Sequence, residues 1–317
     1  MVGGVDFRRL GNCGLVVSVV GLGTNNLGMK LGADGSREVV HAALDEGITF
    51  FDTSDSYGAS EARLGELLQG KRDDLVIATK FGSDVRRRGN DNGEDWGARG
   101  SRRYIRRAVE ASLRRLRTDW IDLYQLHFPD PATPLDETLS ALDDLVHEGK
   151  VRYIGSSNLA GWQVTEAEWL ARTHGYQRFV SAQNQYSWLH RGIEADLIPA
   201  LVHYGIGLLP YYPLASGVLT GKYRRGEPPP EGSRIKAWGR ESALTDATFD
   251  VVEKLESFAV ERGVSLLDVA IGGLAAKPAV ASVIAGATSR VQVAANVAAG
   301  AWRPAESDLA ALDEITA

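Results

Sequence analysis

Short apolar runs and amphipathic segments alternate along the chain. Runs rich in β-branched, leucine and aromatic residues predict strands at 19–24, 48–54, 74–81, 121–128, 151–158, 179–186, 205–214 and 281–287. Between most of them lie segments with apolar residues at helical spacing, and several of these end at a glycine suited to a helix C-terminus. A parallel pair of strands needs a crossover, which a helix usually supplies, so the alternation predicts parallel strands.

About eight such units fit a closed (β/α)8 barrel better than an open doubly wound sheet. We therefore predict an α/β fold: a single (β/α)8 TIM barrel domain over 1–317, with a short N-terminal β-hairpin built from "DFRRL" and "GLVVSVV". Two polar stretches, 82–100 and 223–242, follow strand ends on the face where such barrels carry their active sites. They predict extended loops that cover a substrate, and a disordered surface insertion stays open as the alternative for each.

Composition narrows the class of protein. The chain is 44% hydrophobic and 24% charged, which is typical of an ordinary soluble globular protein. A net charge of -6 and a pI near 5.6 argue against a general binder of nucleic acid or of an anionic membrane. Cys13 is the only cysteine, so no intramolecular disulfide is possible, and a cytoplasmic location is the simplest expectation. No stretch is apolar over the length that a membrane span requires, and the first residues lack the apolar core of a signal peptide.

Familiar ligand-binding motifs fail on spacing. In "GLGTNNLG", Gly21 and Gly23 would need a glycine at the position of Asn26 to form the dinucleotide-binding fingerprint. The segment "GVLTGKY" lacks the phosphate-loop pattern. The six histidines are scattered without a His-x-x-x-His pair, so we expect no metal site.

Four polar residues occur where predicted strands end. Asp52 and Tyr57 follow the second strand, Lys80 lies near the end of the third, and His127 ends the fourth. Each alone is an ordinary strand-end residue, but the C-terminal ends of barrel strands surround one pocket, so we expect the four to meet there. Asp55, between the first two, is expected to be a turn residue.

Together these residues suit proton transfer to an oxygen. Lys80 could lower the pKa of Tyr57 by favouring phenolate, and a shift of two units takes roughly 2.7 kcal/mol. Asp52 could keep Lys80 protonated and oriented, and His127 could donate a hydrogen bond to a substrate oxygen. A tyrosine so placed is suited to protonating an oxygen that is becoming an alkoxide.

From about Phe7 to Asn296 the chain resembles the aldo-keto reductase superfamily. "FFDTSDSYG", "ATKFG" and "LYQLHFPD" are similar to the segments with its catalytic Asp, Tyr, Lys and His, and occur in the same order. "FRRLGNCGLVVSVVGLGTNNLG" and "LASGVLTGKY" resemble the branch of bacterial sugar and aldehyde reductases and potassium-channel β subunits. The resemblance implies a barrel that binds NADP(H) without a Rossmann domain and reduces small-molecule aldehydes and ketones.

The resemblance also implies a set of cofactor contacts. Ser157 and Asn158 in "GSSN", with Gln183, would hold the nicotinamide carboxamide, and Tyr211 would stack on its ring. Tyr212 stands where the family usually has serine. Arg290 could grip a 2′-phosphate, which favours NADP over NAD. The full predicted cofactor set is Gly23, Thr24, Ser157, Asn158, Gln183, Tyr211, Leu214, Gly217, Lys222, Gly286, Ser289, Arg290, Gln292 and Asn296.

Three functions remain open. The first is an NADPH-dependent carbonyl reductase with Tyr57 as general acid. The second is a Schiff-base lyase that uses Lys80 as nucleophile. The third is a regulatory NADP(H)-binding protein of low turnover. Trp96, Trp188 and Trp238 could shape the substrate pocket or serve packing alone.

Overall fold

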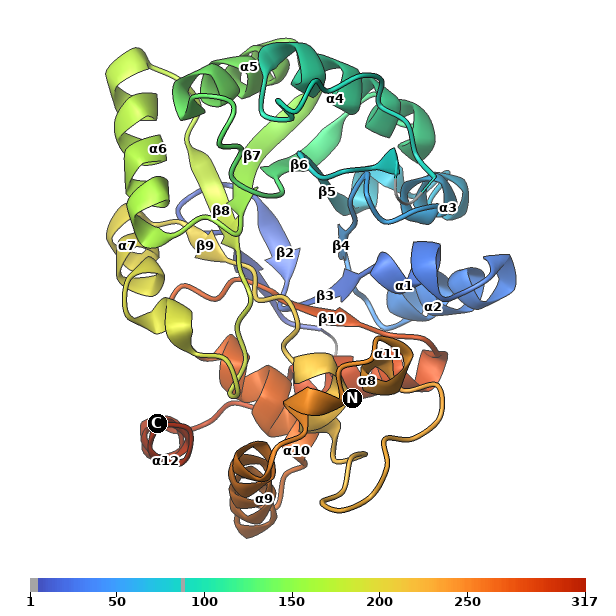
Figure 1. The fold of residues 1–317 in the computed structure, drawn as a ribbon, viewed down its shortest axis with the longest axis vertical. Coiled ribbons are helices and arrows are strands. Elements are labelled where there is room, and N and C mark those ends of the chain that lie inside the picture. The colour runs from blue at the N-terminus through green and yellow to red at the C-terminus, as the bar shows by residue number, and fades with distance from the viewer. Residues whose placement is uncertain (1–4, 87–88) are drawn as a thin grey trace.

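The computed structural model describes residues 5–86 and 89–317. Eight parallel strands form one sheet in the order β10-β3-β4-β5-β6-β7-β8-β9. In Figure 1 the strands surround the centre of the molecule and the helices lie around the outside. The strands are β3 (Val20–Gly23), β4 (Phe50–Asp52), β5 (Val76–Phe81), β6 (Ile121–Leu126), β7 (Val151–Ser157), β8 (Phe179–Gln183), β9 (Gly207–Leu208) and β10 (Val283–Gly286).

The two edges of the sheet meet. Leu208 of β9 forms a parallel bridge with Val280, just before β10. The Leu208 amide donates to Ala279 O at 2.7 Å, and the Ala281 amide donates to Leu208 O at 2.9 Å. These bonds close the predicted (β/α)8 barrel, and all eight predicted strands are present.

Helices cover the outside of the barrel (Figure 1). α4 shows why they form: apolar residues three and four apart give it one buried face, and Ser101 caps its N-terminus by accepting a bond from the Tyr104 amide. The helices are α1 (Asn25–Met29), α2 (Ala33–Asp45), α3 (Ser60–Leu67), α4 (Arg102–Leu116), α5 (Leu135–His147), α6 (Gly161–His174), α7 (Leu197–Tyr204), α8 (Arg234–Ala237), α9 (Asp246–Glu261), α10 (Leu266–Asp268), α11 (Arg290–Ala299) and α12 (Glu306–Ile315).

The predicted N-terminal hairpin is present as β1 (Phe7–Arg9) and β2 (Val16–Ser18), which pair antiparallel. Leu10 and Val17 are fully buried and belong to an apolar cluster with the strand residues Phe50 and Leu123. The Arg8 guanidinium donates to the carbonyl oxygens of Ala275 at 2.7 Å and of Val280 at 2.9 Å. The hairpin is therefore tied to the barrel through its interior and through the segment before β10.

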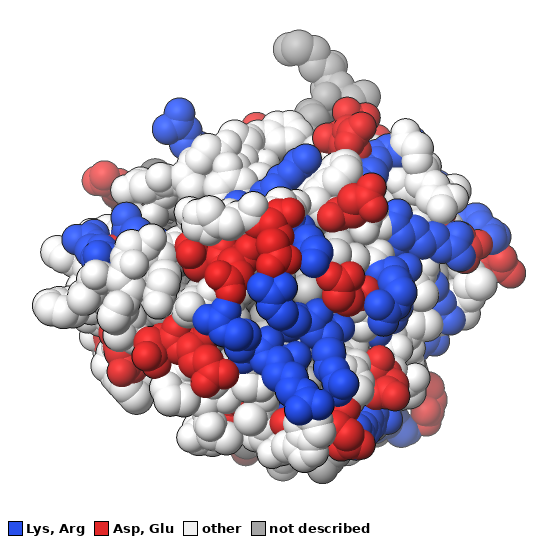
Figure 2. Space-filling view, turned by 90° about the horizontal axis from the view of Figure 1, so that it is seen from above, with Lys and Arg blue, Asp and Glu red and all other residues white. Residues whose placement is uncertain are grey.

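The outer surface mixes both signs of charge. Figure 2 looks from above, the side where α4 and α5 lie in Figure 1, and blue and red side chains adjoin there. Arg106 of α4 pairs with Glu148 just after α5 at 2.6 Å, and Lys150 pairs with Glu110 at 2.8 Å. Within 5–86 and 89–317, no helix combines the length and apolar character needed to cross a membrane.

Candidate active site

A cavity of about 1220 Å³ opens at the C-terminal ends of the strands. Asp52, Tyr57 and His127 line it, while Lys80 lies fully buried behind them. The predicted cofactor residues that line it are Gly23, Thr24, Ser157, Asn158, Gln183, Tyr211, Leu214, Gly217, Lys222, Gly286, Gln292 and Asn296. Its volume exceeds the range of about 300–1,000 Å³ typical of small-ligand sites, so it has room for a large ligand.

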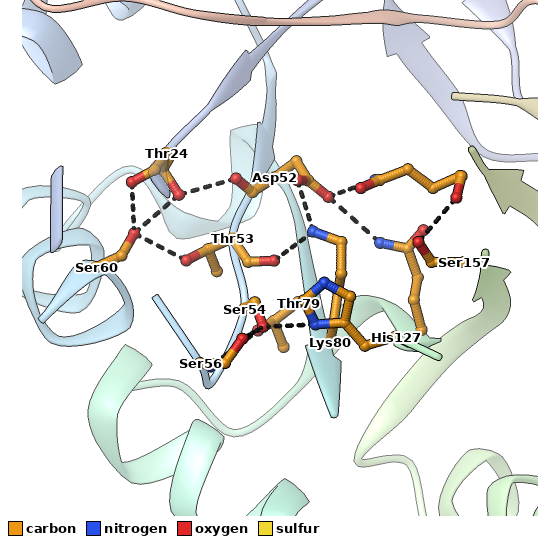
Figure 3. A network of polar contacts seen from close by, with 12 residues as sticks. Thr24, Asp52, Thr53, Ser54, Ser56, Ser60, Thr79, Lys80, His127 and Ser157 are labelled. Carbon is orange, nitrogen blue, oxygen red and sulfur yellow. Dashed lines mark hydrogen bonds and ion pairs between the residues drawn. The ribbon is translucent and has the colours of Figure 1, made fainter. Parts of the chain in front are cut away.

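A buried ion pair joins Asp52 and Lys80 (Figure 3). Lys80 Nζ lies 2.7 Å from Asp52 Oδ2 and donates a second bond to the carbonyl oxygen of Thr53 at 2.8 Å. The other carboxylate oxygen, Oδ1, accepts the side-chain amides of Gln183 at 2.7 Å and Gln125 at 3.3 Å. Burial lowers the pKa of Lys80, and the charge and hydrogen bond of Asp52 oppose that shift. The Thr53 carbonyl thus fixes the position of the Lys80 ammonium, and the two glutamine side chains fix that of the Asp52 carboxylate.

Tyr57 lies beside this pair, with its ring centroid 5.1 Å from Lys80 Nζ. Burial raises the pKa of Tyr57 well above its ordinary value of 10, and the negative charge of Asp52 raises it further. The net pKa of Tyr57 is therefore raised and not lowered as expected, because burial and the charge of Asp52 have the largest effects. The charge of Lys80 is balanced by Asp52 at 2.7 Å, and both bonds from its ammonium go to Asp52 and Thr53. Tyr57 is a neutral phenol, which is the form that can donate a proton.

His127 faces the cavity from the end of β6. Its ring stacks on Phe128 with centroids 4.7 Å apart, and the ring of Tyr57 lies nearly perpendicular to it with centroids 5.9 Å apart. Burial lowers the pKa of His127 well below 6.5, and the charge of Lys80 lowers it further. Its Nδ1 lies 3.1 Å from Ser54 Oγ and 3.0 Å from Ser83 Oγ. His127 is therefore a neutral imidazole held by its neighbours.

Asn158 links several of the predicted nicotinamide contacts. Its backbone has φ of 60°, a left-handed conformation in which asparagine is enriched. The side-chain amide donates to His127 O at 2.9 Å, and its oxygen accepts the Tyr211 hydroxyl at 2.7 Å. Ser157 Oγ donates to Gln183 O at 2.8 Å. The structure thus brings together these predicted residues at the ends of β7 and β8.

Four cations line the cavity without a carboxylate partner among the described residues, namely Lys30, Lys222, Arg234 and Arg240, and two of them, Lys222 and Arg234, are partly buried. Burial lowers the pKa of Lys222, and the charge of Arg234 lowers it further. The Arg234 guanidinium donates to Asn26 Oδ1 at 2.9 Å. A Cβ at Gly217 would lie 2.5 Å from Lys222 Nζ, so glycine there leaves room for the lysine. This part of the wall suits an anion.

Arg290 and Ser289 do not line this cavity. The Arg290 guanidinium pairs with Asp45 of α2 at 2.9 Å, and Ser289 caps the N-terminus of α11 by accepting the Gln292 amide. Thr288 lines the cavity beside Gln292 instead. The Arg290 side chain is directed to Asp45 of α2 here, and its reach to a cofactor phosphate stays a prediction.

The two predicted polar loops, 82–100 and 223–242, differ in how much of the cavity they line. Residues 230–234 line the cavity together with Trp238 and Arg240, as predicted for the loop 223–242. In the loop 82–100, whose residues 87–88 lie outside the described residues, only Ser83 and Asp84 line it. Trp96 is exposed on the surface, and Trp188 is buried in an apolar cluster.

Asp55 is buried, although its backbone lies in a turn as expected. Its Oδ2 accepts the Asn92 amide at 2.8 Å, and burial raises its pKa well above 3.8. The loop 82–100 thus supplies a partner for Asp55.

Four further residues of the site were not predicted from the sequence: Ser54, Ser83, Gln125 and Arg234. Only Arg234 carried a signal, since it lies within a loop predicted to cover the substrate.

A (β/α)8 barrel hosts many chemistries, so the class of protein follows from sequence similarity to a known family. The model of the Aldo/keto reductase family matches residues 19–317, and the chain belongs to this family. The resemblance stated from the sequence is thereby confirmed.

Relatives of several kinds are similar to the chain. An uncharacterized oxidoreductase, YrpG of Bacillus subtilis, is 36% identical over 89% of this chain and 87% of its own. L-glyceraldehyde 3-phosphate reductase of Escherichia coli is 31% identical over 94% of this chain and 88% of its own. A probable voltage-gated potassium channel subunit beta of Oryza sativa is 33% identical over 93% of this chain and 91% of its own. These relatives fall in the predicted branch.

Proposed function

We propose that the protein is an NADPH-dependent reductase of small aldehydes, sugars or related carbonyl compounds. The observation that carries this proposal is the buried Asp52–Lys80 pair, 2.7 Å apart, beside Tyr57 in a cavity that His127 also lines. Every group needed to bind a carbonyl oxygen and give it a proton is present at that point.

Tyr57 is proposed as the general acid. A nicotinamide cofactor, when bound, supplies the hydride for the carbonyl carbon. Tyr57 gives its phenolic proton to the oxygen, and the ammonium of Lys80, 5.1 Å from the ring, favours the phenolate that remains. Asp52 positions Lys80 and keeps it charged, since the two share a short bond in a buried setting. His127 binds the substrate oxygen from the other side of the pocket.

The cavity wall fits a phosphate-bearing cofactor. Lys222 and Arg234 line it without carboxylate partners within the described chain, and both have a pKa lowered by burial. A bound anion would relieve that cost, because it favours the charged form of both groups. We propose that these two residues, rather than Arg290, hold the cofactor phosphates.

The Schiff-base alternative has less support. Lys80 is fully buried, and its ammonium donates to Asp52 and to the Thr53 carbonyl. A nucleophilic lysine needs a neutral amine that reaches the substrate. The Asp52 carboxylate favours the charged ammonium, and burial keeps Lys80 behind the cavity wall.

An assay of a carbonyl and sugar panel with NADPH and with NADH tests the proposal. We expect carbonyl-dependent oxidation of NADPH, with lower efficiency for NADH. In Tyr57→Phe, turnover should fall by orders of magnitude while NADPH affinity stays within a few-fold, because only the proton donor is removed. Undiminished turnover in that variant contradicts the role of Tyr57. NADPH binding without turnover on any carbonyl in the wild-type protein favours the regulatory alternative.

A further inference from the structure

The ring of His127 is held by two serine hydroxyls that the proposed reaction does not itself use. Ser54 follows β4 and Ser83 follows β5, so three neighbouring strand ends meet at His127. Both hydroxyl oxygens lie close to the same ring nitrogen, Nδ1, at 3.1 Å and 3.0 Å. Figure 3 shows the contact between Ser54 and the ring.

The other ring nitrogen is the one available to a substrate. Nε2 of His127 has no hydrogen-bond partner within the part of the chain that the structure describes, and His127 lines the cavity. Phe128 stacks on one face of the ring with an interplanar angle of 11°, and the planes of the Tyr57 and His127 rings make an angle of 81°. The ring plane is therefore restrained. The position of the ring proton then decides whether Nε2 is a hydrogen-bond donor or an acceptor.

A neutral imidazole has one donor and one acceptor nitrogen. Burial and the charge of Lys80 both lower the pKa of His127, so the ring carries a single proton. A carbonyl oxygen is an acceptor, so Nε2 must hold that proton to bind it. The alternative tautomer would direct a lone pair at the oxygen and repel it.

The hydroxyl contacts favour Nδ1 as the acceptor. Ser54 Oγ already accepts the Ser56 amide at 3.2 Å, which leaves its hydrogen to be donated. Ser54 Oγ lies 3.1 Å from Nδ1, 2.9 Å from Ser56 Oγ and 3.3 Å from Asp55 Oδ1, so Nδ1 is one of three acceptors within reach of its hydrogen. Within the described residues Ser83 Oγ has Nδ1 as its only hydrogen-bond partner, so it is free to donate its hydrogen there. A hydroxyl hydrogen donated to Nδ1, with Ser83 as the donor and Ser54 as a second hydroxyl nearby, favours the ring proton on Nε2.

We propose that Ser83, assisted by Ser54, holds His127 in the tautomer that carries its proton on Nε2, so that the ring donates a hydrogen bond to the carbonyl oxygen of a bound substrate. The role toward substrate rests on the proposed function, whereas the tautomer itself is a property of the protein alone. Both serines are positioning residues, since they act through His127.

Nuclear magnetic resonance of the full chain labelled with nitrogen-15 histidine tests this proposal. Two-bond proton–nitrogen correlations distinguish a protonated Nε2 from a protonated Nδ1, and the His127→Gln variant assigns the signals. We expect Nε2 to carry the proton in the wild-type protein. Ser83→Ala should shift the His127 signals toward a mixture of tautomers, and Ser83→Thr, which keeps the hydroxyl, should restore them. A proton on Nδ1 in the wild-type protein, or unchanged signals in Ser83→Ala, overturns the proposal.

Kinetics supply a second readout. Ser83→Ala should lower kcat about tenfold, the effect of losing one hydrogen bond in the transition state, while KM for NADPH stays within about twofold. Ser257→Ala is the matched control, because Ser257 is an exposed serine of α9 whose hydroxyl, among the residues that the structure describes, bonds only to Glu253 O of its own helix. If the wild-type protein reduces no carbonyl, the proposed function fails, and the His127 signals still decide whether the serines set the tautomer.

Discussion

Gly28 and the backbone of Tyr57 lie so close together that any side chain at position 28 would collide. A Cβ on Gly28 would lie 1.6 Å from the carbonyl oxygen of Tyr57 and 2.9 Å from the amide nitrogen of Ser60. α1 therefore supports the segment that carries Tyr57, although Gly28 lies outside the cavity lining.

Gly28→Ala should displace Tyr57 and impair turnover. We expect a loss of about 1–3 kcal/mol in the free energy of unfolding, because backbone must move to admit the methyl group. We also expect kcat for carbonyl reduction to fall by about tenfold or more, because a small misplacement of a catalytic group is costly. Urea denaturation and steady-state kinetics measure the two effects.

Gly32→Ala is the control for this prediction. Its Cβ would meet nothing within 4 Å, and its φ of -74° is open to any residue. Stability should change by no more than about 0.5 kcal/mol. Equal effects of the two substitutions would contradict the support of Tyr57 by Gly28.

The buried pair predicts a non-additive effect on stability. Asp52→Asn or Lys80→Met alone should cost about 3–5 kcal/mol, because each leaves one buried charge without its partner. The double variant should cost less than the sum of the two, since it leaves neither charge behind. Urea unfolding of all four proteins gives the coupling energy, and strictly additive losses would argue against a coupled pair.

Cofactor affinity should depend on Lys222 and hardly at all on Arg290. Lys222→Ala should weaken NADPH binding about tenfold, the effect of one lost bond to a charged group. Arg290→Ala should leave it within about twofold, because Asp45 already holds that guanidinium. Fluorescence titration with NADPH and NADH measures both. A larger loss in Arg290→Ala would show that the pairing with Asp45 breaks when the cofactor binds.

The pH dependence of turnover should be flat through the mildly alkaline range. The proton donor is the neutral phenol of Tyr57, and a pKa raised above 10 moves its loss of the proton to higher pH. His127 has a pKa lowered below 6.5, so it is already neutral at pH 7. We expect constant kcat from about pH 7 to about pH 9.5. A decline centred near pH 8 would instead indicate a Tyr57 whose pKa is lowered by Lys80.

Local sequence predicted the barrel well, because each strand is an apolar run bounded by polar turns. The sequence predicted the ends of the strands less well. The run predicted as a strand at 205–214 contains only the two-residue strand β9, Gly207–Leu208. Pro210 lacks an amide to donate, and Tyr212 has φ of 53°, a left-handed conformation that ends extended structure.

The candidate catalytic residues were predictable because they stand at strand ends, and the barrel brings such ends together. Their partners were not. Arg290 meets Asp45 from a helix 245 positions earlier, and His127 meets Ser54 from 73 positions earlier. Such pairings depend on the helix and strand register of the finished fold, and serines are too common to be singled out by pattern.

The hairpin at the N-terminus also constrains the order in which the molecule can be completed. Arg8 binds the carbonyl oxygens of Ala275 and Val280, which lie 267 and 272 positions later in the chain. The Arg8 contacts of this hairpin can therefore form only when the segment just before β10 is in place. Contacts of such long range form late and slow folding, so we expect these bonds of the hairpin to be among the last to form.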